Sequence, residues 1–230
     1  MYILMDLVVN HCSDEHEWFK KACEDPDGEY GKYFYIEDCP DGKLPCNWRS
    51  YFGGSVWEPL PGHPDKYYLH MFHKKQPDLN WENPKVRDEV FDMMNWWCEK
   101  GIDGFRMDVI SLISKPEGLP DGPAGENGYG DSGCANGPHV HEYLQEMNRR
   151  VLSKYDLITV GEAAGVTLEE AKKYANADGS ELNMVFQFEH TGAGKDAHNH
   201  YGKWDSEKMP LPEWKATLSK WQTGLAGNAW

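Results

Sequence analysis

The sequence predicts an α/β fold in which parallel strands alternate with helices. Short apolar runs of strand length are followed, along the whole chain, by segments whose apolar residues recur at helical spacing. Three of the apolar runs end in polar side chains: residues 2–11 (YILMDLVVNH), 104–110 (GFRMDVI) and 158–165 (ITVGEAAG). Opposed carboxylates released at strand ends are the arrangement that glycoside hydrolysis requires. The pattern therefore favours chemistry on sugars.

Size and charge narrow the class of protein. The chain has 230 residues, of which 40% are hydrophobic, so it is long enough to bury a core. Its net charge of −15 argues against nucleic-acid and anionic-membrane partners, which attract clustered Lys and Arg. No apolar run reaches the ~20 residues of a membrane helix. The first apolar stretch lacks the basic start of a signal peptide, so we expect a cytoplasmic location.

Cysteine usage agrees with a reducing compartment. The six cysteines are widely spaced and form no CxxC pair, which argues against zinc binding. Cys39 and Cys46 flank a turn-rich stretch and could meet. Because no secretion signal is visible, free thiols are expected.

The first element is a strand over residues 2–9, ending in Asp6, Asn10 and His11. Its nearly continuous apolar character is typical of buried parallel strands. Ser13 is then in position to cap a helix over residues 16–24.

Residues 25–81 have a different composition, rich in Gly, Pro, Asp and aromatic side chains. Short strands are predicted within them at residues 32–38 and 66–72. The aromatic content is too high for a disordered linker, so we expect an inserted subdomain over residues 25–81. The barrel-forming part would then comprise residues 1–24 and 82–230.

Regular structure resumes with a helix over residues 83–101. Asn83 is a capping residue, Pro84 suits the first helical position, and Gly101 suits the C-terminal end. Five residues of this helix share one face and are expected in the core: Val86, Val90, Met93, Met94 and Trp97.

The remaining elements continue the alternation of strand and helix. A strand at residues 102–110 precedes a Gly- and Pro-rich loop, 114–137, which is long enough to be functional. Thr167 and Glu170 form a capping-box pattern. The other predicted elements are helices at residues 141–155, 167–175 and 211–227, and strands at residues 157–163 and 184–190.

Four segments resemble signature regions of the α-glucosidase branch of glycoside hydrolase family 13, the α-amylase clan. They are residues 6–11 (DLVVNH), 76–81 (QPDLNW), 104–110 (GFRMDVI) and 160–165 (VGEAAG). Oligo-1,6-glucosidases, dextran glucosidases and isomaltases are the most similar members. The resemblance implies a (β/α)8 TIM barrel of which this chain holds about strands 3–6, with the small β-rich subdomain inserted after the first of them.

The Asn-His-Asp motif of the family's seventh strand does not occur in this sequence. We therefore expect a fragment of a longer enzyme. Half a barrel leaves two open sheet edges and an unclosed core, so the 230-residue product alone is expected to be inactive and poorly soluble.

The resemblance implies that Asp108 is the nucleophile and Glu162 the general acid/base. Arg106 and Asp108 lie on the same face of one strand, so the guanidinium would keep the nucleophile ionised. On spacing alone, Arg106 and Asp108 could equally be a structural ion pair. Glu162 could likewise be a structural charge near the N-terminus of the helix at residues 167–175.

The same resemblance implies a set of substrate-binding residues. His11 would bind a sugar hydroxyl, and Asp6 would support Arg106. Phe52, Phe72 and Gln76 would line the pocket mouth, although such aromatic residues could simply be the core of the inserted subdomain.

Two further residues bear on linkage and metal binding. Val109, directly after the nucleophile, accompanies α-1,6 preference in this branch. The family residue that corresponds to Asn10 ligates calcium in many α-amylases, but this branch generally lacks that calcium site. We therefore expect neither a metal nor a cofactor.

The expected function is a retaining α-glucosidase that hydrolyses α-1,6 bonds, with α-1,4 bonds left open, from the non-reducing end of short oligosaccharides. Trehalose-6-phosphate hydrolase, sucrose isomerase and transglucosylase are alternatives within the same fold. A non-catalytic relative, such as the heavy chains of amino-acid transporters, is a further alternative. The presence of both Asp108 and Glu162 argues against it.

Overall fold

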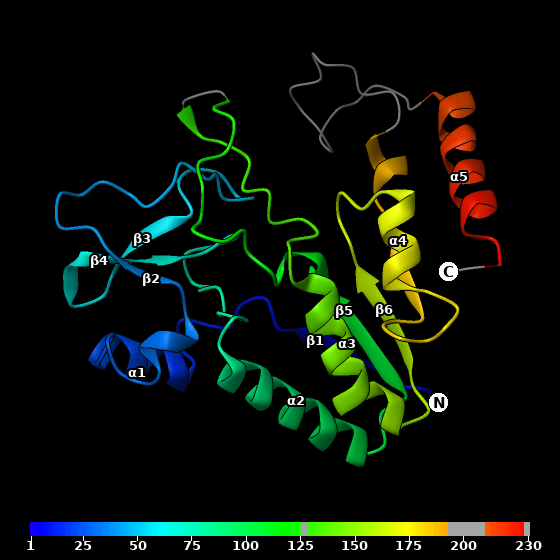
Figure 1. Cartoon of the computed structure of the whole chain (residues 1–230), viewed down its shortest axis with the longest axis horizontal. Helices are drawn as coiled ribbons and strands as arrows, with labels where there is room; N and C mark the ends of the chain where they lie inside the picture. Colours follow the sequence, from blue (N-terminus) through cyan, green and yellow to red (C-terminus); the bar gives the residue numbers. More distant parts are fainter. Residues whose placement is uncertain (126–127, 193–209, 228–230) are drawn as a thin grey trace.

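The structure, a computed structural model, describes residues 1–125, 128–192 and 210–227 (Figure 1). Its strands form two sheets. A four-stranded sheet has the order β1-β5-β6-β7, and a three-stranded sheet has the order β2-β4-β3. All pairs in the first sheet are parallel, and all pairs in the second are antiparallel.

The parallel sheet contains the strands predicted to carry the polar side chains. It consists of β1 (Leu4–Val8), β5 (Gly104–Asp108), β6 (Ile158–Glu162) and β7 (Met184–Phe186). One prediction was wrong in detail: Asp6 lies inside β1, directly opposite Arg106, and not at the strand end. The last predicted strand is also shorter than expected, because a 3-10 turn occupies Glu189–Gly192.

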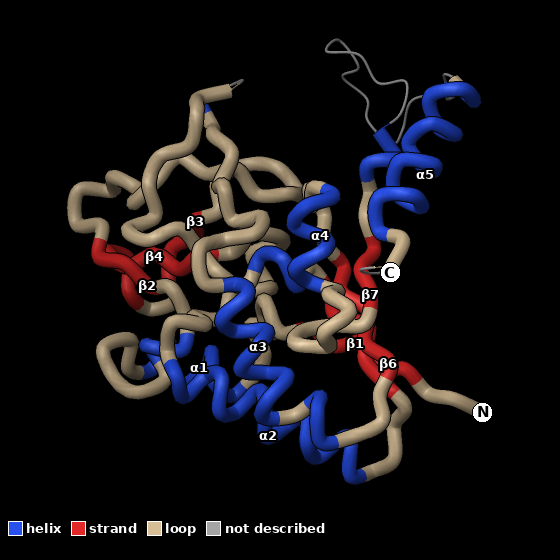
Figure 2. The backbone as a smooth tube through the Cα atoms, turned by 45° about the vertical axis from the view of Figure 1, so that its right-hand side comes forward, coloured by secondary structure: helices blue, strands red, loops and turns tan. Residues whose placement is uncertain are grey.

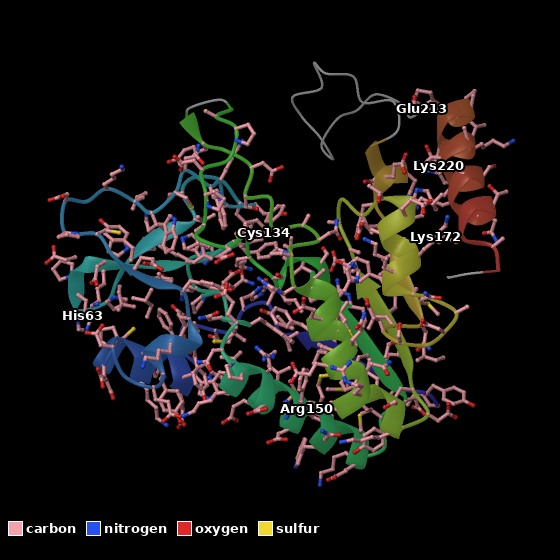
Figure 3. All side chains as sticks on the ribbon, in the orientation of Figure 1. His63, Cys134, Arg150, Lys172, Glu213 and Lys220 are labelled. Carbon is pink, nitrogen blue, oxygen red and sulfur yellow. The ribbon has the colours of Figure 1, made fainter. Side chains whose placement is uncertain are left out.

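The helices in the described residues are α1 (Glu17–Glu24), α2 (Pro84–Glu99), α3 (Val140–Arg150), α4 (Leu168–Tyr174) and α5 (Leu211–Leu225). Helix α1 lies beside the antiparallel sheet, and α2 and α3 lie beside the parallel sheet (Figure 1). Figure 2 shows α2 and α3 lying against each other beside the sheet. Arg150, labelled in Figure 3, joins them through an ion pair of 2.7 Å with Asp88 of α2.

The core lies between these helices and the sheet. Phe105 and Met107 of β5 are fully buried in one cluster with Met94 of α2 and Met147 of α3. Their neighbours Arg106 and Asp108 point to the opposite face because side chains alternate along a strand. One face of β5 therefore holds the helices while the other presents charged groups.

Helix capping was predicted correctly at two helices and wrongly at one. Asn83 caps α2 by accepting from the Lys85 amide, and Thr167 caps α4 by accepting from the Glu170 amide. Helix α1 is capped by His16, whose Nδ1 accepts from the Trp18 amide. The Ser13 hydroxyl instead accepts from the Glu15 amide in the turn before the helix.

The predicted core face of α2 is rotated in the structure. Val86, Val90 and Met94 are buried as expected, but Met93 is 37% exposed and Trp97 is half-buried. Phe91 and Cys98 are buried instead.

The predicted inserted subdomain contains the antiparallel sheet. Its strands are β2 (Ile36–Asp38), β3 (Trp57–Leu60) and β4 (His63–Leu69), of which β3 was not predicted. Isolated bridges join His11 to Asp78 and Phe34 to Leu79, so this sheet is tied to the end of β1. The division of the chain at residues 25 and 81 stays a prediction.

The structure also shows the state of the cysteines and the length of the apolar helices. All six cysteines are free, and Cys46 accepts a hydrogen bond from the Trp57 indole instead of pairing with Cys39. In the ranges that the structure describes, no helix is both long and apolar enough to cross a membrane.

A half-buried histidine joins α3 to α4 and to the segment before β7. His141 Nδ1 lies 2.9 Å from Glu181 Oε2, and its Nε2 lies 3.1 Å from Glu170 Oε2. Burial alone would lower the pKa of His141, but its hydrogen bonds and charge interactions with the two carboxylates outweigh that and raise the pKa. Lys173 also bonds Glu170, and the Tyr174 ring contacts His141.

Replacing His141 should give a pH-dependent loss of stability. Because the folded pKa is raised, the stabilisation is fully present below the unfolded pKa of about 6.5 and is lost as the pH rises through the folded pKa. We expect His141→Gln to lower the free energy of unfolding by about 1–3 kcal/mol at acidic pH and by less at alkaline pH. Denaturant unfolding at several pH values measures this difference.

His139 provides the matched control, because it lies at the same helix start but pairs with the exposed Glu142. His139→Gln should change the unfolding free energy little at any pH. A His141→Gln effect that stays constant from acidic to alkaline pH would contradict the charged bridge.

Candidate active site

The guanidinium of Arg106 binds three carboxylates that come from three neighbouring strands. One of its nitrogens lies 2.7 Å from Asp6 Oδ1 of β1 and 2.6 Å from Asp108 Oδ1 of β5. Its other nitrogen donates to Glu162 Oε2 of β6. Asp6, Asp108 and Glu162, predicted from the sequence as site residues, are thus brought together around the predicted Arg106.

The strand register explains why these groups meet. Arg106 lies opposite Asp6 on one side and Val160 on the other, while Glu162 ends β6 two residues further on. Strands β1, β5 and β6 are adjacent and parallel, so their carboxyl ends lie at one edge (Figure 1). This edge is where enzymes built on parallel barrels hold their catalytic groups.

Glu162 is in a position to stay protonated to a higher pH than an ordinary glutamate. Burial raises the pKa of Glu162, and the neighbouring Asp108 raises it further, whereas the Val109 amide and Arg106 oppose the shift. The net direction is upward. A carboxyl group that keeps its proton suits a general acid.

Val109 turns the chain sharply after Asp108. Its φ of 38° and ψ of 38° lie in the left-handed region, which is uncommon for a β-branched residue. The turn places its amide 3.4 Å from Glu162 Oε2. Local strain of this kind occurs at functional sites.

A second group of predicted residues gathers around His11. The ring nitrogen Nε2 of His11 lies 3.0 Å from Gln76 Nε2, and the His11 and Phe72 ring centres are 5.3 Å apart. Phe52 contacts Phe72 in turn, with 5.9 Å between ring centres. The structure therefore brings His11, Phe52, Phe72 and Gln76 into one cluster.

His11 loses its proton at a lower pH than an ordinary histidine, because its pKa is lowered. Burial lowers the pKa of His11, and the Lys115 charge lowers it as well, although Asp78 and Asp108 oppose the shift. A neutral imidazole offers one donor and one acceptor to a sugar hydroxyl.

Lys115 was missed by sequence reasoning. Its ammonium lies 2.7 Å from Asp78 Oδ2, 2.9 Å from Asn10 Oδ1 and 2.7 Å from the Leu112 carbonyl oxygen. The side chains of Lys115 and Asp78 are both fully buried. The presence of Asn10 and Asp78 in the segments at residues 6–11 and 76–81 was the available signal.

The Lys115 ammonium occupies the space between oxygens of the type that hard cations bind. Among the residues that the structure describes, no group of three or more His, Cys, Asp or Glu is arranged for a metal ion. The expectation that Asn10 binds no calcium stays a prediction, and Lys115 gives a physical reason for it.

Lys115 also connects the two halves of the site. Asn10 donates to Asp78 Oδ2 at 3.0 Å and lies 3.3 Å from His11 Nδ1. The other Asp78 oxygen accepts from the Met71 amide at 2.8 Å, one residue before Phe72. The buried ion pair thus fixes the end of β1 against the antiparallel sheet.

A model of the α-amylase catalytic domain matches residues 1–230 of the chain. The chain belongs to this family. The resemblance inferred from the four segments is therefore confirmed. The parallel strands and the helices of this chain form part of the family's (β/α)8 barrel.

Three members of the family illustrate how similar this chain is to known proteins. An alpha-glucosidase of Pediococcus pentosaceus is 52% identical over 99% of this chain and 41% of its own length. An oligo-1,6-glucosidase of Halalkalibacterium halodurans is 51% identical over 100% of this chain and 41% of its own length. The crystal structure of trehalose-6-phosphate hydrolase from Bacillus licheniformis matches 100% of this chain and 40% of its own, with a TM-score of 0.90 and 44% identity. The chain thus spans about two fifths of the length of the curated relatives it matches.

Removing the Lys115 charge should strongly destabilise the protein. Lys115→Met leaves Asp78 buried without its partner, which typically costs about 3–5 kcal/mol of unfolding free energy. Denaturant unfolding measures the loss. The matched control is Lys74→Met, because Lys74 forms an exposed ion pair of 3.6 Å with Glu58 and should contribute at most about 1 kcal/mol. Equal effects of the two variants would contradict a structural role for the buried pair.

Proposed function

We propose that this chain carries the catalytic pair of a retaining α-glucosidase acting on the non-reducing ends of isomalto-oligosaccharides. The observation that supports this most is the meeting of Asp108 and Glu162 on one guanidinium at adjacent strand ends. Retaining glycosidases need two such carboxyl groups close together.

In the first step, Asp108 attacks the anomeric carbon of the terminal glucose. The glycosidic C–O bond breaks, and Glu162 gives its proton to the departing oxygen. The glucose is then bound covalently to Asp108. The ion pair with Arg106 orients Asp108 for the attack, and Asp6 holds Arg106 in place.

In the second step, water replaces the enzyme on the anomeric carbon. Glu162, now ionised, removes a proton from the water, whose oxygen attacks the anomeric carbon and releases Asp108. The two opposite inversions retain the α-configuration. Glu162 ends the cycle protonated and Asp108 ionised.

Substrate binding is assigned to the His11 cluster. His11 and Gln76 would bind hydroxyl groups of the terminal glucose, while Phe52 and Phe72 would line the mouth of the pocket. Val109 offers a branched apolar side chain beside the nucleophile and supports a preference for α-1,6 over α-1,4 bonds. Discrimination by one such side chain is modest, about 1–3 kcal/mol.

We also propose that the enzyme works in the cytoplasm, since six free thiols suit a reducing compartment. Malto-oligosaccharides are the second class of substrate. Trehalose 6-phosphate and sucrose are the substrates of the alternative enzymes, trehalose-6-phosphate hydrolase and sucrose isomerase. Both compounds are therefore included among the substrates to be tested.

The proposal is tested with the protein expressed together with its flanking coding sequence. We expect turnover of isomaltose to exceed that of maltose, and Asp108→Asn to reduce it by roughly 10³-fold or more, because the nucleophile is lost. Glucose release under saturating substrate measures both. The control is Asp41→Asn, which removes an exposed carboxylate from the antiparallel-sheet region and should leave turnover unchanged.

Each outcome has a distinct meaning. Preference for maltose would keep the mechanism and overturn the assignment of linkage to Val109. Preference for trehalose 6-phosphate or sucrose would replace the substrate class. Absence of turnover on the whole panel would contradict the proposed function.

A further inference from the structure

Phe72 connects His11 to two further aromatic rings, Tyr51 and Phe52. Phe72 contacts His11, and the Tyr51 ring stacks on Phe72 with 5.0 Å between centres and an interplanar angle of 16°. Phe52 meets Phe72 edge-on. We call Tyr51, Phe52 and Phe72 the aromatic platform. The sequence reasoning singled out Phe52 and Phe72 but not Tyr51.

Most of the platform faces solvent. Tyr51 is 52% exposed and Phe52 is 70% exposed, while Phe72 is half-buried. Single exposed aromatic residues are ordinary, but contiguous exposed rings next to His11 indicate a binding surface. The exposure of Phe52 also argues against the alternative that it is part of the core of the antiparallel-sheet region.

The backbone under the platform is fixed by one buried serine. The Ser50 hydroxyl donates to the Phe72 carbonyl at 2.6 Å and accepts from the Phe52 amide at 3.2 Å. Ser50 itself is only 3% exposed. The Tyr51 amide donates to the Met71 carbonyl at 2.9 Å, which ties the loop to the segment that follows β4.

The tight turn that follows depends on glycine. The Ser50 amide donates to the Gly54 carbonyl and the Gly53 amide donates to the Ser50 carbonyl. Gly53 and Gly54 have φ values of 98° and 77°, which glycine adopts without steric cost. The rings are therefore presented by an ordered loop, which reduces the entropy cost of binding.

The ring contacts order the aromatic side chains relative to His11, the residue assigned to the terminal glucose. Phe72 contacts His11 directly, and Tyr51 contacts Phe72. Aromatic faces suit the apolar faces of sugars. Tyr51 is thus placed to contact the sugar beyond the terminal one.

We propose that Tyr51 is a substrate-binding residue that stacks on the second sugar ring, and that Ser50 is a positioning residue for the aromatic platform. This inference rests on the proposed α-glucosidase function. It implies that Tyr51 affects substrates with a second sugar and leaves the chemistry at the anomeric carbon unchanged.

The test compares isomaltose with α-glucosyl fluoride, which carries the terminal glucose but no second sugar. In the protein expressed with its flanking coding sequence, Tyr51→Ala should raise KM for isomaltose by about 3- to 10-fold at nearly unchanged kcat. Both constants for α-glucosyl fluoride should stay the same. Tyr51→Phe should retain most of the isomaltose affinity, since it keeps the ring.

Ser50→Ala should act in the same direction as Tyr51→Ala, raising KM for isomaltose but not for α-glucosyl fluoride. Its matched control is Ser55→Ala, because the Ser55 hydroxyl lies in the same loop but accepts a hydrogen bond from the Trp57 amide, away from the aromatic platform. Ser55→Ala should leave both substrates unaffected.

The outcomes separate this inference from the proposed function. Unchanged KM for isomaltose in Tyr51→Ala, with normal turnover, would overturn the inference and leave the function intact. An equal loss on both substrates would show a merely structural role and overturn it as well. No turnover of either substrate by the unaltered protein would overturn the proposed function, and the inference with it.

Discussion

One guanidinium shared by three carboxylates is the constraint on which the site depends. Arg106 takes the same face of β5 as Asp108 and lies between the strands that carry Asp6 and Glu162. Without its positive charge, the three carboxylates on these adjacent strands would repel one another. Arg106 therefore lets the sheet hold Asp108 beside a second carboxyl group, Glu162, whose pKa is raised by burial and by Asp108.

A second charge holds the half of the site around His11. The fully buried Lys115 ammonium donates hydrogen bonds to Asn10 Oδ1 and the Leu112 carbonyl oxygen and forms an ion pair with Asp78. These contacts join the barrel strand that leads to His11 with the antiparallel sheet that leads to the aromatic platform. The carboxylates around Arg106 thus belong to the parallel sheet, whereas the aromatic platform lies in loops next to the antiparallel sheet. Their relative position is fixed by a pair that water does not reach.

Sequence patterns predicted the features that local chemistry determines. The cap at Asn83 and the strand ends at Asp108 and Glu162 follow from residue type and spacing, so they were predictable. Features set by tertiary contacts were not. A lysine between helices and loops is ordinarily exposed, so nothing local marks Lys115 as buried. The cap of α1 came from His16 because Ser13 was used in a preceding turn, and Met93 is exposed because the buried stripe of α2 includes Phe91 and Cys98.

The central claim is that Asp108 becomes covalently bound to glucose while Glu162 manages the proton. It is tested most directly by trapping that intermediate with an activated fluorinated α-glucoside, which slows its hydrolysis, followed by mass spectrometry of the digested protein. We expect one added sugar on the peptide that contains Asp108, and none on that peptide in Asp108→Asn. A sugar attached to another residue, or hydrolysis of the probe without any labelled peptide, would contradict the assignment of Asp108 as nucleophile.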